Sequence, residues 1–249
     1  MKKLLLIITF SLTSLISCEQ QVTEENATGR TISSQQELIT TCDYSAVSIS
    51  LRTPTTINQT VDLINALPKP LSIPCFIESL TRPLKLNITL SKSSAQPAVG
   101  TTSPRIFIIS DDLVLSIVPE GKGAYFLELS QMYSDSSSVK SELEFPVREA
   151  ITYQTGYDRI NLGGATACGP CHLNEQPDNS IAESNAFTSF ALKPKSNMDL
   201  VDFKSELYKC ELETSLSYRC QMIKSIFKFE QVSEVDFPSG TPRWIDTIN

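Results

Sequence analysis

Residues 105–118 read Arg105-Ile-Phe-Ile-Ile-Ser-Asp-Asp-Leu-Val-Leu-Ser-Ile-Val118, in which two apolar segments flank a short polar turn. This pattern is typical of two antiparallel strands joined by a tight hairpin. Residues 84–90 alternate apolar and polar side chains, which predicts another, half-buried strand. We expect further strands at 47–51, 125–129 and 143–147, separated by loops rich in Ser, Pro and Gly at 91–104 and 130–141. The sequence therefore predicts an antiparallel β-sandwich-like domain over residues 41–150.

After about residue 150 the pattern changes to helical spacing. Residues 185–192 are expected to form a short helix that ends before Pro194. A longer helix is predicted after Ser196 or Asn197 as N-cap, with an apolar face formed by Leu200, Phe203, Leu207 and Cys210. A second helix is predicted with an apolar face formed by Leu216, Cys220, Ile223 and Phe227. The expected fold class is therefore α+β, with a small, mainly helical region over residues 151–249.

The composition excludes several classes of function. The chain has 249 residues, of which 41% are hydrophobic and 20% charged, as in globular proteins. Its net charge is −7, and an acidic surface argues against binding to duplex nucleic acid. The chain contains a single histidine, so zinc sites with more than one histidine and haem ligation by two histidines of this chain are excluded.

The N-terminus has the pattern of an export signal. Lys2 and Lys3 precede an apolar stretch that is too short to cross a bilayer, and it ends at Leu15-Ile-Ser-Cys18. This ending resembles a bacterial lipobox. The resemblance implies that residues 1–17 are a signal peptide, that Cys18 carries acyl chains, and that residues 18–40 are a flexible tether. In Gram-negative lipoproteins, Glu19 after the cysteine favours sorting to the outer membrane, so we expect a protein of the cell envelope held to the membrane by lipid.

The motif that carries chemistry is Cys168-Gly-Pro-Cys-His172. It resembles the attachment site of c-type haem proteins. The resemblance implies one covalent haem c, with thioether links to Cys168 and Cys171 and with the His172 imidazole as proximal ligand of the iron. It also implies a one-electron carrier or redox partner of another, unidentified redox protein, and it favours electron transfer over an enzyme activity without excluding the latter. A small cytochrome c begins with a helix before this motif, whereas here a β-rich region precedes it.

The second axial position of such an iron is left open by the sequence. A methionine is the expected internal ligand, because no second histidine exists. Met198 is preferred because it lies in a loop at a helix start, Met222 is the second choice, and Met132 is expected in a Ser-rich loop. A vacant sixth position is an equal alternative.

Other interpretations of the motif remain open. Cys168-Gly-Pro-Cys171 is also the active-site sequence of thioredoxins, but no predicted strand precedes it, and Pro177 ends any following helix early. A zinc site could use Cys168, Cys171, Cys210 and Cys220. A surface-binding or scaffold lipoprotein with purely structural disulfides, and without haem, is the alternative function.

The odd number of cysteines is consistent with these assignments. Of the seven, lipid accounts for Cys18 and haem for Cys168 and Cys171, and the remaining four allow three pairings. We favour Cys42–Cys75 in the β-rich region and Cys210–Cys220 in the helical region. A continuous ten-residue helix spans about 15 Å, and a disulfide requires Cα atoms within about 7 Å. The helix must therefore break between Cys210 and Cys220, with Thr214 or Ser215 as the expected cap.

Overall fold

In the computed structural model, which describes residues 42–134, 136–181, 185–195, 197–213, 217–238 and 240–242, the protein is α+β with one eight-stranded sheet. The strands lie in the order β6-β7-β5-β4-β3-β2-β1-β8, and only β8 runs parallel to its neighbour, β1. Their bounds are β1 Leu84–Thr89, β2 Arg105–Ser110, β3 Leu113–Ile117, β4 Phe126–Ser134, β5 Ser137–Glu144, β6 Gln176–Pro177, β7 Phe187–Phe190 and β8 Val232–Glu234.

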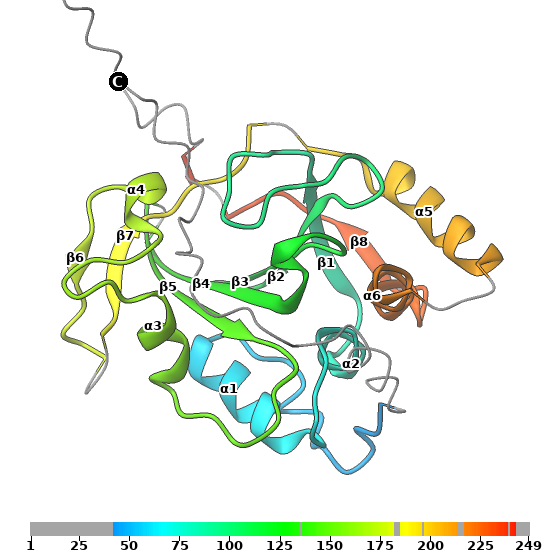
Figure 1. Ribbon diagram of the computed structural model, residues 1–249, viewed down its shortest axis with the longest axis horizontal. Coiled ribbons are helices and arrows are strands. Elements are labelled where there is room, and N and C mark those ends of the chain that lie inside the picture. Colours follow the sequence, from blue (N-terminus) through cyan, green and yellow to red (C-terminus); the bar gives the residue numbers. More distant parts are fainter. Residues whose placement is uncertain are drawn as a thin grey trace, which may run out of the picture.

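Helices cover one face of this sheet and surround its ends (Figure 1). Their bounds are α1 Ile57–Ala66, α2 Ile73–Ser79, α3 Thr155–Ile160, α4 Gly169–His172, α5 Leu200–Leu212 and α6 Tyr218–Phe227, with a 3₁₀ turn at Lys122–Tyr125. The main core lies between the sheet and α1, α2, α5 and α6, and it includes Leu63, Phe76, Leu115, Phe203 and Ile226. The short helix α4 lies at the opposite end of the sheet from α5 and α6, beside β6 and β7 (Figure 1).

The other face of the sheet is polar. Because directly opposed residues in an antiparallel pair project to the same face, the register places Arg105, Ser116, Glu128 and Lys140 together on it. Their alternating neighbours, including Ile106, Leu127 and Val139, project into the main core. Phe107, Ile109 and Val114 form a second, smaller apolar cluster with Val235 and Phe237 on the polar face.

The strands predicted at 84–90, 105–109, 113–118 and 125–129 are confirmed, but the sandwich is not. The strand predicted at 143–147 covers only the end of β5, and Val147 forms an isolated bridge with Leu71. The hairpin at 105–118 forms β2 and β3, and the described strands build one sheet covered by helices rather than two facing sheets. Residues 47–51 form turns instead of a strand, and α1 and α2 follow them within the region predicted as β. The predicted loop at 130–141 is wrong, since its residues belong mostly to the β4–β5 hairpin.

The C-terminal region contributes to the same sheet. Residues 187–190 form β7, which pairs with β5, where a short helix was predicted, and β8 pairs with β1. The predicted helices α5 and α6 are confirmed, with Asp199 and Ser217 in the N-cap positions rather than the expected residues. The two regions expected on either side of residue 150 therefore share one sheet.

Both favoured disulfides are present. Cys42–Cys75 and Cys210–Cys220 each have a Cα–Cα distance of 5.2 Å. The second links α5 to α6 across the expected helix break, which the structure places after Leu212. Within the described part of the chain, no helix combines the length and the apolar character needed to cross a bilayer. Cys18 and the rest of residues 1–41 lie outside the described residues.

Candidate functional site

A cavity of about 310 Å³ lies over the polar face of the sheet and contains the sequence motif in its wall. Cys168, Cys171 and His172 line it from one side, and the strands β2 to β5 contribute Arg105, Phe107, Glu128, Met132 and Lys140 from the other. The segment 191–195 and residues Phe237 and Thr241 complete the lining. The three motif residues that the sequence singled out therefore meet a set of strand residues at one site.

The motif is held in place by a short hydrogen-bonded loop. Thr166 donates from its backbone N–H to Glu175 Oε2 at 2.8 Å, and its hydroxyl contacts the other oxygen of the same carboxylate. The Thr166 hydroxyl in turn accepts from the Cys168 N–H at 3.1 Å. A Cβ at Gly169 would lie 2.5 Å from Glu175 Oε2, so a side chain at this position would displace the carboxylate. A larger residue at position 169 would therefore disturb the contact between Glu175 and Thr166.

The His172 ring is oriented by a backbone carbonyl. Its Nδ1 lies 2.8 Å from the carbonyl oxygen of Phe190 in β7, so Nδ1–H donates to that oxygen in the neutral ring. Nε2 then carries the lone pair, and it has no hydrogen-bond partner among the described residues. A histidine that ligates a metal through one nitrogen usually donates from the other to a carbonyl or carboxylate. The ring therefore has the tautomer that a metal-binding histidine needs.

The surroundings of His172 keep its imidazole uncharged. The pKa of His172 lies well below 6.5, chiefly because burial disfavours the imidazolium, and secondly because the Lys140 charge lies nearby. The hydrogen bond to Phe190 acts in the opposite direction and is outweighed. A neutral imidazole is the form that binds metals.

This depressed pKa makes the stability of the fold sensitive to mild acid. The unfolded chain carries histidine with a pKa near 6.5, so below that pH it binds a proton that the folded chain does not. We expect the free energy of unfolding to fall as pH drops through 6.5, by at most about 1.4 kcal/mol per pH unit. Denaturant unfolding between about pH 7 and pH 5 measures this loss. A His172→Gln variant shares all carboxylates and is expected to lack this component, so equal pH profiles for the two proteins would contradict the assignment.

The two motif cysteines differ in state. Cys168 is free, and burial, assisted by the Glu128 charge, raises its pKa to about 12. A thioredoxin-type dithiol needs a lowered pKa at its first cysteine, so this environment is unsuited to that chemistry. Cys171 is disulfide-bonded, so it is not available as a free thiol.

The cavity contains several charged groups, most of which are paired. Arg105 contacts Glu128 at 2.5 Å and donates to Ser116 Oγ at 2.7 Å. Glu142 accepts from Arg159 at 2.8 Å, but burial still raises the pKa of its carboxyl group. Lys140 is only 6% exposed, and burial lowers its pKa to about 8. Charged groups at this depth are rare in a protein interior and mark a candidate functional site.

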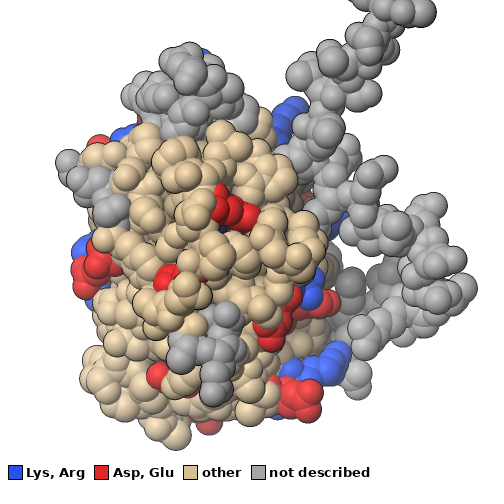
Figure 2. Space-filling view, turned by 90° about the vertical axis from the view of Figure 1, so that its left-hand side faces the viewer, with Lys and Arg blue, Asp and Glu red and all other residues tan. Residues whose placement is uncertain are grey.

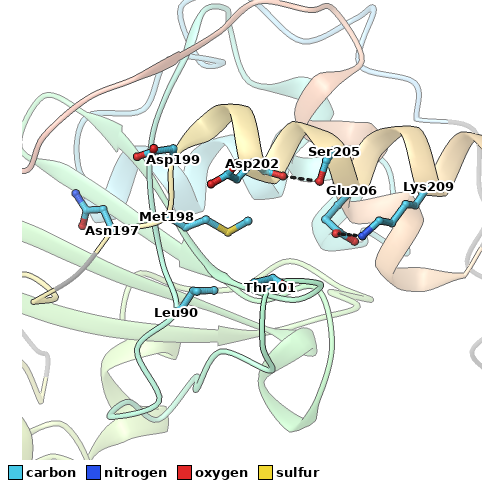
Figure 3. Close-up of a pocket in the computed structure, with 9 residues that line it drawn as sticks. All are labelled: Leu90, Thr101, Asn197, Met198, Asp199, Asp202, Ser205, Glu206 and Lys209. Atoms are coloured by element: carbon cyan, nitrogen blue, oxygen red, sulfur yellow. Dashed lines mark hydrogen bonds and ion pairs between the residues drawn. The ribbon is translucent and has the colours of Figure 1, made fainter.

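The methionine that lines the same cavity as His172 is not the one that the sequence favoured. Met132, on β4, lines the same cavity as His172. Met198 lies in another pocket, beside Asp199, Asp202 and Glu206 at the start of α5, where none of the motif residues is found (Figure 3). Met222 is fully buried in the main core, on the other face of the sheet.

The four cysteines that a zinc site would need are not gathered. Cys210 and Cys220 form their disulfide in the main core, whereas Cys168 and Cys171 line the cavity over the polar face. Among the described residues, Cys210, Glu213 and Cys220 place potential ligand atoms within 4.8 Å of one another. Both sulfurs in that group are already used in the disulfide, so the group is unsuited to a metal ion.

Lys140 and Arg105 were not predicted as site residues. A signal was present, since Ser138, Lys140 and Glu142 alternate with Val139 and Leu143. Such alternation indicates a strand with one polar face but does not show that another segment covers that face.

The surface around the motif carries little concentrated charge. Figure 2 shows the side of the molecule that lies at the left of Figure 1, where α4, β6 and β7 are found. Uncharged residues predominate on this side, acidic side chains are scattered, and basic groups lie toward its edges. Leu162 and Leu173, which flank the motif, are 69% and 39% exposed.

Comparison with known proteins gave no relative: no protein-family model, no curated protein and no solved structure matches this chain.

Proposed function

We propose that the protein is a c-type haem protein that carries single electrons in the cell envelope. The observation that carries this proposal is the arrangement of His172, whose Nδ1–H is bound to the Phe190 carbonyl while Nε2 is left available, in a cavity also lined by Cys168 and Cys171. Spacing in the sequence alone puts the three residues in a known attachment pattern. The structure adds a neutral imidazole of the required tautomer.

The residues of the cavity are compatible with haem. Its volume of about 310 Å³ is at the lower end of the range for ligand pockets, roughly 300–1,000 Å³. Porphyrins are large ligands, so a bound haem would be only partly enclosed by this cavity, which suits electron exchange with another protein. Phe107, Val114 and Ile160 supply apolar contacts, and Lys193 and Lys195 are available for the propionate groups. When bound, haem supplies a one-electron iron couple.

Attachment requires both motif sulfurs as thiols. A thioether forms when an S–H bond adds across a vinyl group, with the sulfur bonding to one vinyl carbon and the proton to the other. Cys168 is available in this form. Cys171 is disulfide-bonded, so a thiol reductant must supply two electrons and two protons to release it before attachment.

The proposed location of the protein is the cell envelope, where it would be held to the membrane by lipid. The lipobox-like ending at Cys18 supports a lipid-anchored protein, and Glu19 supports the outer membrane of a Gram-negative bacterium. The surface near the motif, with exposed Leu162 and Leu173, is suited to brief contact with an electron-transfer partner.

The test is maturation of the full chain together with haem-attachment machinery. We expect a pyridine haemochrome spectrum and a mass increase of one haem, both lost in the variant Cys168→Ala/Cys171→Ala. The matched control Cys42→Ala/Cys75→Ala removes a disulfide outside the site and is expected to keep the haem, with a loss of about 2–4 kcal/mol in stability. A colourless protein of unchanged mass under these conditions would refute the proposal.

The second candidate function is a surface-binding lipoprotein without haem, whose cavity takes another small ligand. The disulfide at Cys171 favours this alternative, because it occupies a sulfur that haem attachment needs. Mapping of the mature protein by mass spectrometry without reduction distinguishes the two. Retention of the Cys171 disulfide, together with an unmodified Cys168 thiol, supports the alternative.

A further inference from the structure

Lys140 occupies an unusual position for a lysine. It lies in β5 on the polar face of the sheet, it is 6% exposed, and it lines the same cavity as the motif. Its ammonium donates to Ser138 Oγ and Ser189 Oγ at 2.8 Å each, and to the carbonyl oxygen of Phe190 at 3.1 Å. An ammonium has three donors, and all three are used here. Its orientation is therefore fixed.

The Phe190 carbonyl connects Lys140 to His172. The same oxygen that accepts from Lys140 Nζ lies 2.8 Å from His172 Nδ1. A carbonyl oxygen has two lone pairs, so both donors can be accommodated at once. A cation on one side of this oxygen withdraws electron density from it, which weakens its pull on the imidazole Nδ1–H on the other side.

The charge of Lys140 has no direct counter-ion. Among the described residues it forms no ion pair. The carboxylate that acts on its pKa is that of Glu175, which is hydrogen-bonded to Thr166. The carboxylates of Glu128 and Glu142 on the same sheet face are bound to Arg105 and Arg159. Burial lowers its pKa to about 8, so at pH 7 most molecules still carry the charge. A buried charge without a direct counter-ion acts more strongly on its surroundings than an exposed one.

We propose that Lys140 is a positioning residue that raises the reduction potential of the haem iron bound by His172. This inference rests on the proposed function. Its positive charge disfavours the ferric state, which carries one more unit of charge than the ferrous state. Its bond to the Phe190 oxygen also makes His172 a weaker electron donor, and this too favours the ferrous state. Both effects therefore raise the reduction potential.

The test is an equilibrium redox titration, at about pH 7, of the matured full-length protein and three variants. Lys140→Met removes the charge at similar length, Lys140→Arg keeps it, and Lys85→Met removes the charge of an exposed lysine on β1 that does not line the cavity. We expect Lys140→Met to lower the midpoint potential by about 59 mV. This corresponds to an about tenfold change in the equilibrium constant of one-electron reduction. Lys140→Arg should keep most of the wild-type midpoint, and Lys85→Met should leave it close to the wild-type value.

A second measurement, which does not need haem, reports on the hydrogen bond from His172 to the Phe190 carbonyl oxygen. The chain has one histidine, so the ring ¹⁵N spectrum of the apoprotein reports on His172 alone. We expect Nδ1 to be protonated in the wild type, and its resonance to indicate a stronger hydrogen bond in Lys140→Met.

The possible outcomes are distinct. If haem attaches and Lys140→Met leaves the midpoint unchanged, the inference is wrong while the proposed function stands. If Lys140→Arg lowers the midpoint as much as Lys140→Met does, packing rather than charge is responsible, and the inference is again overturned. If no haem attaches to the wild type, the proposed function fails, and this inference fails with it.

Discussion

Replacing Arg219 by methionine is expected to lower the free energy of unfolding by about 3 kcal/mol. Arg219, at the start of α6, forms an ion pair with Glu206 of α5, and the two side chains are 10% and 3% exposed. Arg219 also donates to the carbonyl oxygen of Thr102 at 2.8 Å and contacts Cys210 Sγ at 3.2 Å. Its removal leaves a buried carboxylate that keeps only Lys209, whose side chain is 62% exposed.

Two further variants separate the cost of the unpaired charge from the loss of packing. Lys209→Met removes the exposed partner of the same carboxylate, at 2.5 Å, and is expected to cost less than about 1 kcal/mol. The double variant Arg219→Met/Glu206→Met removes both charges and should recover most of the stability lost in Arg219→Met. Denaturant unfolding with the disulfides intact measures all three. A double variant as unstable as Arg219→Met would show that packing, not the unpaired carboxylate, causes the loss.

The strands of this fold could be predicted from the sequence where one side of the strand meets the main core. In β1, Leu84, Leu86 and Ile88 are all buried and separated by one residue, which is the spacing of a strand face. The first two helices had signals that a β interpretation overlooked. Ile57, Val61 and Ile64 are buried at helical spacing, and the Thr56 side chain caps the helix by accepting from the Gln59 N–H.

The helix α2 shows how the same residues can be interpreted in two ways. Ser72-Ile-Pro74 can be read as a rigid entry to a strand, but a Ser N-cap followed by Pro in the first turn is typical of a helix start. Ser72 accepts from the Cys75 N–H at 3.3 Å, as a capping residue does. The disulfide from Cys75 then ties this helix to Cys42.

The sequence identified only the contiguous part of the candidate site. The spacing of Cys168, Cys171 and His172 is local and can be recognised in the sequence, because the motif is contiguous. The groups opposite it come from strands far away along the chain, and their proximity depends on the register of the sheet and on the segment that closes over it. Met132 illustrates the limit, because its predicted loop is in fact part of β4.

Replacing Met132 by leucine is expected to lower the reduction potential of the matured protein on the order of 0.1 V, because loss of a thioether ligand favours the ferric state. Met132 lines the cavity with His172 and is 9% exposed, so it is the methionine that we propose as sixth ligand. The ferric absorption band that is typical of methionine ligation should disappear together with the shift in potential.

Met198→Leu is the matched control, because Met198 is also buried, at 8% exposed, but packs in the main core and lines a different pocket. Exchange of Met for Leu preserves volume, so each variant should lose less than about 1.5 kcal/mol in stability. The absorption spectrum and the reduction potential should therefore change in Met132→Leu and not in Met198→Leu. A change in Met198→Leu instead would support the ligand that the sequence favoured and would require a rearrangement around α5. If neither variant changes the spectrum, methionine does not occupy the sixth position, and the site is open to an external ligand.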